Sequence, residues 1–326
     1  MAIGEFDLID RYFRRQQELE SVELGIGDDC ALLRVPADKL LAVSMDTLVA
    51  DVHFPADAAP EDIAQRALRV NLSDLAAVGA EPLWFTLGLT LPHQDHQWLI
   101  DFSRGLFSAA REFNVALVGG DTTRGPLTIS IQVHGAVANH AALRRDGARV
   151  GDAIFVSGSL GDGAAGLKVL QQDELSDSDA SMYFLERFYR PRPHLKEGRL
   201  LSGLASAALD VSDGLLADLE HICEASGVAA HIDTEKLPLS ESMKQWVDGG
   251  VVDEKQARQW ALSGGDDYRL CFTVPENKRA QLLALQQKHR LNFQCIGEIT
   301  HGEGVICLDA GRTVTPSEKG YNHFGH

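Results

Sequence analysis

The chain has 326 residues, of which 44% are hydrophobic and 24% charged, and its formal net charge at pH 7 is −17. This composition is typical of a soluble globular protein, and the length is about twice the usual ~150 residues of one domain, so we expect two domains. The negative charge argues against a nucleic-acid partner, because such binding depends on clustered Lys and Arg. No run approaches the roughly 18 to 20 apolar residues of a membrane span, and residues 1–15 lack the apolar core of a signal peptide, so we expect a cytoplasmic protein with no membrane partner.

The first half of the chain alternates strand-like with helix-like segments. Four segments in which apolar and β-branched residues cluster or alternate are predicted to be strands: 40–43, 83–91, 115–118 and 127–137. A helix is predicted over 60–78, since Pro60 suits a helix start, apolar residues recur at a near-helical period, and Gly79 ends the pattern. A second helix is predicted over 98–113.

A polar segment, 140–152, is the expected domain boundary. We therefore predict an N-terminal domain over 1–140 and a C-terminal domain over 150–326, both of the α/β (α+β) class. The second half is predicted to contain strands and helices in alternation, beginning with these segments: strand 153–156, helix 163–171, strand 207–211 and helix 214–226.

Acidic residues beside glycine or serine recur along the first half. Asp28 and Asp29 follow Gly25-Ile26-Gly27, and adjacent carboxylates there suit a metal site or a plain turn. Ser44-Met45-Asp46-Thr47 comes just past an apolar strand, so Asp46 is placed either to bind a cation or simply to turn the chain. His53 follows in a Val-His-Phe run, where it either contacts a substrate or lines a pocket.

Two further motifs of the first half carry an aspartate. Asp74 lies at the edge of the buried face of the predicted helix 60–78, where a metal would serve as its partner, although an exposed position is equally consistent with the pattern. Gly119-Gly120-Asp121 reads as a strand running into a glycine turn, whose N–H groups face an anion while Asp121 holds Mg²⁺. It matches neither a Walker A loop nor a Gly-x-Gly-x-x-Gly fingerprint, so neither a P-loop NTPase nor a Rossmann dehydrogenase is indicated.

The second half adds three motifs of the same kind. Residues 158–163 precede a helix and are predicted to face a phosphate. Asp210 and Ser212 share a strand face, and Asp213 sits at the next helix start, where a helix cap is the alternative. Residues 263–268 form a glycine turn with paired acids that enters a strand.

Together these motifs predict a phosphoryl-transfer site. Carboxylates gathered in one cleft imply several Mg²⁺ ions, because the ions neutralise both the acids and the phosphate chain of ATP. Transfer of a phosphoryl group depends mostly on positioning and charge stabilisation, and no general base stands out among the acids.

These motifs resemble those of the thiamine-monophosphate kinase family, a member of the superfamily that includes aminoimidazole ribonucleotide synthetase. The similarity extends nearly end to end and includes Gly4-Glu5-Phe6, Gly25-Ile26-Gly27-Asp28-Asp29-Cys30-Ala31, Asn71-Leu72-Ser73-Asp74-Leu75-Ala76, Gly119-Gly120-Asp121-Thr122-Thr123, Asp210-Val211-Ser212-Asp213-Gly214-Leu215, Ser263-Gly264-Gly265-Asp266-Asp267-Tyr268 and Lys319-Gly320-Tyr321-Asn322-His323-Phe324.

The resemblance implies direct in-line transfer from ATP to thiamine monophosphate, and a homodimer whose N-terminal α/β domains together form an intersubunit β-barrel. It implies the following metal ligands: Asp29, Ser44, Met45, Asp46, Asp74, Asp121, Asp210 and Asp213. The implied ATP contacts are Gly120, Asp121, Arg145 and Ser212, and the implied substrate contacts are His53, Asp266 and Tyr321.

The chain departs from the family pattern at two positions. Met45 stands where the family commonly has Thr, so a metal contact there would use the main-chain carbonyl, and Asp266 is one methylene shorter than the usual Glu. The alternatives are another ATP-dependent member of the superfamily, such as aminoimidazole ribonucleotide synthetase, and a non-catalytic nucleotide or metal-binding protein. Selenophosphate synthetase would need a reactive Cys or selenocysteine before Cys30, and the hydrogenase-maturation protein a C-terminal Cys, whereas this chain ends Phe324-Gly325-His326.

Overall fold

The structure is a computed structural model that describes residues 4–14, 19–172, 175, 178–318 and 320–321, with the side chains of residues 5 and 6 outside the description. The chain divides into two compact units. The N-terminal unit comprises Met1–Leu75 and Ala80–His140, and the C-terminal unit comprises Ala76–Gly79 and Ala141–His326. Among the described residues, every helix falls short of the length and apolar content that a membrane crossing requires.

The N-terminal unit is built on a four-stranded sheet in the order β3-β6-β4-β5. Its elements are α1 (Glu5–Tyr12), β1 (Val22–Leu24), β2 (Leu32–Leu33), β3 (Lys39–Val49), α2 (Pro60–Ala77), β4 (Glu81–Leu91), α3 (His96–Glu112), β5 (Ala116–Arg124) and β6 (Thr128–Ala138). Both predicted helices and all four predicted strands are confirmed, with the strands starting or ending up to several residues away from the expected positions.

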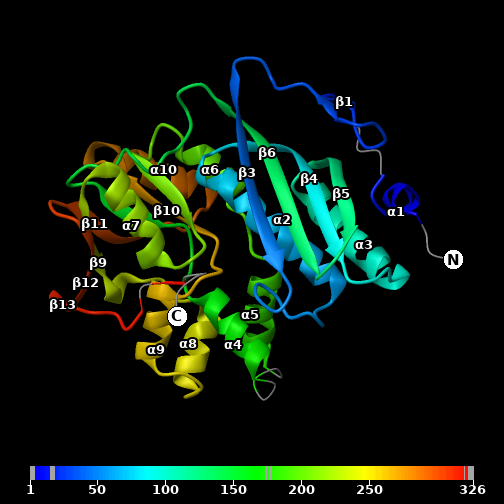
Figure 1. The fold of residues 1–326 in the computed structure, drawn as a ribbon. Helices are drawn as coiled ribbons and strands as arrows, with labels where there is room; N and C mark the ends of the chain where they lie inside the picture. The colour runs from blue at the N-terminus through cyan, green and yellow to red at the C-terminus, as the bar shows by residue number, and fades with distance from the viewer. Residues whose placement is uncertain (1–3, 15–18, 173–174, 176–177, 319, 322–326) are drawn as a thin grey trace. The chain divides into compact units, whose positions relative to one another are not determined.

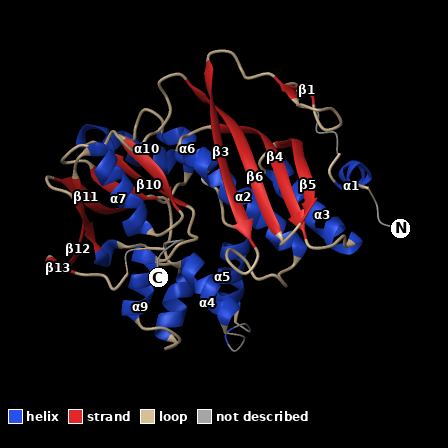
Figure 2. Ribbon diagram, viewed as in Figure 1, coloured by secondary structure: helices blue, strands red, loops and turns tan. Residues whose placement is uncertain are grey.

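The helices α2 and α3 lie behind the sheet in the view of Figure 2. Phe85, Leu87 and Leu89 of β4 alternate toward one face of the sheet and are almost fully buried. Helix α3 is capped by the Asp95 carboxylate, which accepts hydrogen bonds from two main-chain N–H groups of the first turn. This packing leaves the opposite face of the sheet free of the two helices.

Two motifs expected in turns lie inside strands instead. Ser44 to Thr47 are in the middle of β3, because β3 continues to Val49 in unbroken antiparallel pairing with β6. Asp121 lies within β5, opposite Gly88 of β4, because parallel pairing with β4 carries β5 past the two glycines. The prediction of turns at these positions was wrong, since strand pairing outweighs the local preference of Gly and Asp for turns.

The C-terminal unit has a seven-stranded sheet in the order β13-β12-β9-β11-β7-β10-β8. Its strands are β7 (Ala153–Val156), β8 (Ala207–Val211), β9 (Ala229–Asp233), β10 (Arg269–Val274), β11 (Gln294–Thr300), β12 (Gly304–Asp309) and β13 (Arg312–Val314). Its helices are α4 (Asp162–Gln171), α5 (Asp179–Tyr189), α6 (Leu195–Leu201), α7 (Leu215–Ser226), α8 (Glu241–Asp248), α9 (Glu254–Ser263) and α10 (Arg279–His289), with 3₁₀ turns η2 (Thr234–Lys236) and η3 (Glu276–Lys278).

Both faces of this sheet are covered. On one face Val156 and Cys271 pack with Leu219 of α7 in a single buried cluster. On the other face Phe155 stacks on Phe272 at 5.7 Å between ring centroids. The predicted strands 153–156 and 207–211 are confirmed, and the predicted helices begin within one residue of α4 and α7. The four helices α4, α5, α8 and α9 are grouped together at the bottom of Figure 1.

Candidate functional site

In the N-terminal unit, β3 and α2 hold three of the predicted metal ligands close together. Ser44 Oγ donates a hydrogen bond of 2.6 Å to Asp74 Oδ2. The Asp46 main-chain N–H donates to Asn71 Oδ1 at 2.9 Å, so Asn71 fixes the strand beside the helix. Asn71 is itself fully buried and donates to the Ala67 carbonyl. The residues Ser44, Asp46 and Asp74 therefore form one cluster on regular secondary structure.

Asp121 lies elsewhere on the same sheet. By strand register, Asp121 shares a face with Gly88, Ser130 and Thr47, whereas Asp46 alternates to the opposite face. Asp46 is on the edge strand β3 and Asp121 on the edge strand β5, so three strand spacings, or about 14 Å, separate them. One ion cannot contact both carboxylates of the same chain.

Met45 also lies on the face opposite Asp46, with 59% of its side chain exposed. A contact shared with Asp46 therefore needs the Met45 main chain. Gly120 is required sterically, since a Cβ there would lie 2.0 Å from the Leu87 carbonyl oxygen. Asp29 is exposed in a bend in which its N–H donates to the Asp28 carboxylate.

His53 closes the end of β3. Its Nδ1 accepts a hydrogen bond of 3.0 Å from the Val49 N–H, and its carbonyl accepts from Arg66 Nε. Because Nδ1 accepts, a neutral His53 carries its proton on Nε2, and the ring can donate from that atom. This tautomer suits a hydrogen bond to an anionic group.

In the C-terminal unit, three predicted motifs meet at one edge of the sheet. Strand β10 is antiparallel to both β7 and β8, with Cys271 opposite Val156 and Arg269 opposite Val211. The ends of β7 and β8 and the start of β10 therefore lie on the same edge. The 158–163 turn follows β7, the 211–214 turn ends β8, and the 263–268 turn leads into β10.

The sequence predicted that the 158–163 turn faces a phosphate, but two of its N–H groups bond to a carboxylate of the protein itself. Gly161 N–H and Gly163 N–H donate to the two carboxylate oxygens of Asp267, at 2.7 and 3.1 Å. The Asp267 carboxylate therefore occupies the position that the sequence predicted for a ligand phosphate. Burial raises the pKa of Asp267 to about 7, and the nearby Asp162 carboxylate adds to the rise, against the opposing effect of the two N–H donors.

Asp162, at the start of α4, is buried among hydroxyl groups. Its carboxylate accepts hydrogen bonds from Ser159 Oγ, Tyr183 Oη and Ser240 Oγ at 2.6, 3.0 and 2.6 Å. Arg269 lies 3.9 Å from the same carboxylate and also donates to the Ser159 carbonyl. The buried charge of Asp162 is thus fully hydrogen-bonded.

The 211–214 turn also encloses an internal carboxylate. Asp218 Oδ2 accepts hydrogen bonds from the N–H groups of Ser212, Asp213 and Gly214, at 3.0, 3.1 and 3.2 Å. Burial raises the pKa of Asp218 to about 7, and the Asp213 charge adds to the rise. The side chains of this turn, rather than its amides, remain for ligands, which favours a cation over a phosphate at this turn.

Two of the three predicted substrate contacts, Asp266 and Tyr321, lie beside this turn. Asp266 and Tyr268 have left-handed backbone conformations, with φ of 69° and 49°, on either side of Asp267. Tyr268 Oη donates to Asp266 Oδ1 at 3.1 Å. The exposed Tyr321 donates its N–H to the Asp213 carbonyl, whereas Lys319 and residues 322–326 of the closing motif lie outside the described residues.

Asp210 is close to these contacts, but Arg145 is not. Asp210 is buried next to the 211–214 turn, at the end of β8. The Arg145 carbonyl accepts from Ser226 Oγ at the last residue of α7, a 12-residue helix that begins just after Gly214. At 1.5 Å per residue, about 18 Å separates the two ends of α7. Arg145 and Ser212 can therefore contact the same ATP only through distant parts of the nucleotide.

The donor set fits Mg²⁺ in its chemistry. Carboxylate and hydroxyl oxygens, without Cys or His, are the ligands that this ion prefers. Among the described residues, no group of three or more His, Cys, Asp or Glu side chains is arranged to hold a metal ion. Each unit contains some of the predicted ligands, and phosphate oxygens are suitable additional ligands for Mg²⁺.

Two residues that organise these sites had no assigned role in the sequence interpretation. Asn71 was visible only as part of the Asn71-Leu72-Ser73-Asp74 motif, and its side chain bonds to a strand 25 residues away. Asp218 was not part of any predicted motif, and it lies in the first turn of α7. Its role is evident only in the structure, where its carboxylate accepts hydrogen bonds from the main chain of the 211–214 turn.

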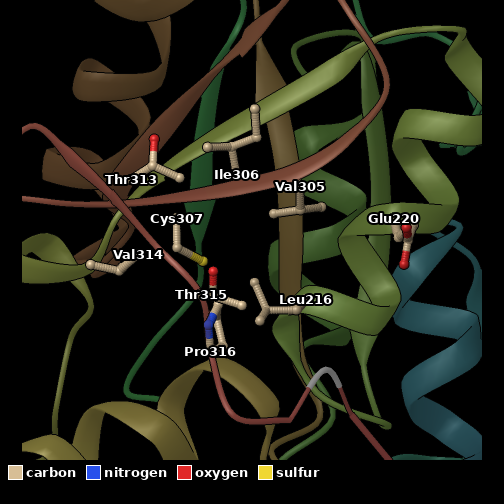
Figure 3. Close-up of a pocket in the computed structure, with 9 residues that line it drawn as sticks. All are labelled: Leu216, Glu220, Val305, Ile306, Cys307, Thr313, Val314, Thr315 and Pro316. Atoms are coloured by element: carbon tan, nitrogen blue, oxygen red, sulfur yellow. The ribbon is translucent and has the colours of Figure 1, made fainter.

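A small pocket of about 190 Å³ lies elsewhere in the C-terminal unit, between α7, β12 and β13. Figure 3 shows its lining residues, with Leu216 and Glu220 on α7 and Val305 and Cys307 on β12. None of the predicted site residues lines it. Its largely apolar lining gives it no evident part in binding phosphates.

Two family models match the chain. Residues 27–137 match the AIR synthase related protein N-terminal domain, and residues 149–309 match the AIR synthase related protein C-terminal domain. The first match falls in the N-terminal unit except for Ala76–Gly79, and the second falls in the C-terminal unit. The chain therefore has the two-domain, mixed α/β fold expected from its sequence.

Full-length relatives narrow the family further. The chain is 49% identical over 327 residues to thiamine-monophosphate kinase of Salmonella typhimurium, covering 99% of both chains. The crystal structure of thiamine-monophosphate kinase from Stenotrophomonas maltophilia is similar with a TM-score of 0.86 and 44% identity, over 94% of this chain and 96% of that one. The structure of AaThiL complexed with AMPPCP and TMP is similar with a TM-score of 0.79 and 34% identity, over 99% of each chain. The chain belongs to the thiamine-monophosphate kinase family.

Proposed function

We propose that this protein is a thiamine-monophosphate kinase, which transfers the terminal phosphoryl group of ATP to thiamine monophosphate and forms thiamine diphosphate and ADP. The observation that carries this proposal is the 49% identity over 99% of both chains with a thiamine-monophosphate kinase. The similarity to AaThiL complexed with AMPPCP and TMP supports ATP and thiamine monophosphate as the two substrates.

The proposed transfer is direct and in line. The acceptor is a phosphate oxygen that is already ionised near pH 7, so the reaction needs no general base. Mg²⁺ bound to the phosphate chain would neutralise the charge that accumulates during transfer. The main requirement on the protein is to hold donor and acceptor in line.

The proposed ligands divide between the two units. In the N-terminal unit, Ser44, Asp46 and Asp74 are ligands of Mg²⁺ at one position, and Asp29 and Asp121 are ligands of Mg²⁺ at other positions. In the C-terminal unit, Asp210 and Asp213 bind cation and Ser212 contacts ATP. This division is supported by the all-oxygen donor set and by the Ser44–Asp74 and Asp213–Asp218 contacts.

The proposed substrate contacts are His53, Asp266 and Tyr321. His53 is suited to donate from Nε2 to the phosphate of thiamine monophosphate, because its Nδ1 already accepts a main-chain N–H. Asp266 is oriented by Tyr268 Oη. We propose that this hydrogen bond compensates for the shorter side chain by fixing the direction of the carboxylate.

We also propose that the protein is a cytoplasmic homodimer joined through the N-terminal sheets. Leu41, Val43 and Met45 alternate toward the face of the sheet that α2 and α3 leave free, and their exposed fractions are 45%, 51% and 59%. A second copy that covers this face would bury them. Replacing Val43 with Asp should therefore convert the dimer to monomer in sedimentation velocity; an unchanged dimer would exclude this face as the interface.

The reaction is tested directly with purified protein, ATP, Mg²⁺ and thiamine monophosphate. Thiamine diphosphate and ADP should form in equal amounts, as identified by mass spectrometry. A parallel reaction without thiamine monophosphate measures any ATP hydrolysis that is not coupled to transfer. If ATP binds but no thiamine diphosphate forms, the protein is a nucleotide-binding protein without this activity.

A further inference from the structure

The 211–214 turn has hydrogen-bond partners for nearly all of its main-chain groups. Its three N–H groups, from Ser212, Asp213 and Gly214, all donate to the single oxygen Oδ2 of Asp218. A carboxylate that accepts three amides fixes the orientation of all three peptide planes at once. Because Asp218 is in the first turn of α7, the turn is attached to a rigid helix.

The carbonyl groups of the same turn accept hydrogen bonds from two distant segments. The Val211 and Ser212 carbonyls accept from Tyr268 N–H and Asp266 N–H, at 2.7 and 2.8 Å. The Asp213 carbonyl accepts from Tyr321 N–H at 2.9 Å. The main chain of the turn is therefore hydrogen-bonded to two of the proposed substrate contacts, Asp266 and Tyr321.

The packing around the turn leaves little room for adjustment. A Cβ on Gly265 would lie 2.6 Å from the Ser212 carbonyl oxygen. A Cβ on Gly320 would lie 2.6 Å from Ala217 Cβ and 2.9 Å from the Asp213 carbonyl oxygen. Because these positions have no room even for a Cβ, a displacement of the turn displaces the 263–268 segment and Tyr321 with it.

We infer that Asp218 is a positioning residue that couples the nucleotide side of the site to the substrate side through the 211–214 turn. One face of the turn presents Ser212 and Asp213 to ATP and its cation, and the carbonyls of the same turn hold Asp266 and Tyr321 in place. Asp218 itself is buried, with an exposed fraction of 5%. This inference rests on the proposed function for the identity of the two ligands, but the mechanical coupling does not.

Coupling is tested by steady-state kinetics of three variants. In Asp218→Ala the turn loses its anchor, and KM should rise at least tenfold for both ATP and thiamine monophosphate. Asp218→Asn keeps one oxygen that can accept the amides, so both KM values should rise in parallel but less. Glu224→Ala removes an exposed carboxylate from the same helix and should change neither value more than twofold.

Hydrogen exchange gives a readout that does not require activity. In Asp218→Ala, or in Asp218→Asn if the alanine variant fails to fold, amides of peptides covering 212–214, 266–268 and 321 should exchange at least tenfold faster. Peptides covering β3, whose main chain pairs with β6 in the N-terminal unit, should keep their protection. The inference is overturned if the three segments do not respond together, or if the variants lose thermal stability while both KM values stay unchanged.

A failure of the proposed function gives a different pattern. If the wild-type protein forms no thiamine diphosphate, the function is wrong, and the exchange experiment still decides whether Asp218 couples the segments. Gly320→Ala probes the coupling from the Tyr321 side, because its Cβ would collide with Ala217 Cβ and with the Asp213 carbonyl oxygen of the turn. It should raise KM at least fivefold for both thiamine monophosphate and ATP; a rise for thiamine monophosphate alone would contradict the coupling.

Discussion

The proposed ligand residues are held in two different ways in the two units. In the N-terminal unit, Ser44, Asp46 and Asp74 project from a long strand and a long helix, and regular hydrogen bonding fixes their backbones. In the C-terminal unit, Ser212, Asp213 and Asp266 lie in irregular turns. There the buried carboxylates of Asp218 and Asp267 replace the missing secondary-structure partners.

In the N-terminal unit, a ligand residue can therefore be changed with little effect on stability. In the C-terminal unit, a change to the buried carboxylates affects both ligand binding and stability. A carboxylate on a strand can lose its charge without changing the strand, since the main-chain pairing does not involve it. A turn whose amides converge on a buried carboxylate loses both its shape and its hydrogen bonds when that carboxylate is removed. Substitutions in the two units should therefore have different signatures.

The largest expected effect is on turnover, in the N-terminal unit. Asp46→Asn should lower kcat by about 100-fold to 1,000-fold, because charge stabilisation by a bound metal contributes several kcal/mol to phosphoryl transfer. The melting temperature should change by less than about 3 °C, since Asp46 anchors to Asn71 through its main chain. Asp38→Asn removes an exposed carboxylate just before the same strand and is the matched control. Wild-type kcat in Asp46→Asn would remove Asp46 from the ligand set.

The second prediction concerns the C-terminal unit, where Gly163 at the start of α4 packs against the 263–268 turn. A Cβ on Gly163 would lie 2.5 Å from the Asp266 carbonyl oxygen and 2.6 Å from that of Gly265. Gly163→Ala should therefore lower the free energy of unfolding by about 2 to 3 kcal/mol, measured by urea denaturation. At Gly88, in β4, a Cβ would meet only ordinary contacts at 3.6 Å, so Gly88→Ala should cost less than about 1 kcal/mol. Equal losses in both variants would contradict the tight backbone packing of the turns.

The same contrast explains what the sequence could predict. Element positions in both units followed from apolar periodicity and from helix start and stop signals, because these patterns are local. The acidic motifs identified the residues of interest, and family resemblance assigned their roles. The sequence pattern failed where a non-local partner decides the conformation, as for the strand pairing that holds Asp46 and Asp121 in strands.

The hydrogen-bond partners of the main-chain amides in the C-terminal unit could not be predicted from local sequence patterns either, because these partners are distant in the sequence. The 158–163 segment looks like a phosphate-binding turn, and its N–H groups do bind an anion, but that anion is Asp267, more than 100 residues away. A glycine turn before a helix predicts an anion and cannot say whether the anion belongs to the protein or to a ligand.

The third prediction uses the raised pKa of Asp267, about 7, compared with 3.8 when unfolded. Between these values the folded protein binds a proton that the unfolded chain releases, so the contribution of Asp267 to stability falls as the pH rises. The free energy of unfolding of the wild type relative to Asp267→Asn should decrease by about 2 kcal/mol from pH 5 to pH 7, as measured by denaturation at each pH. A flat difference for Asp267→Asn would mean that the two N–H donors keep its pKa near the ordinary value.

The smallest expected effect isolates one hydrogen bond to a buried carboxylate. Ser240 caps α8 through the Met243 N–H and also donates to Asp162 at 2.6 Å. Ser178 caps α5 in a similar way, through the Ser181 N–H, and its hydroxyl makes its second hydrogen bond to the Ser181 hydroxyl. Each Ser→Ala change should cost about 1 kcal/mol for the lost cap, and Ser240→Ala should cost about 1 kcal/mol more, because Asp162 then loses one of its donors. If urea denaturation gives equal costs, the remaining hydroxyls and Arg269 suffice for Asp162, and the internal carboxylates of the C-terminal unit tolerate the loss of single partners.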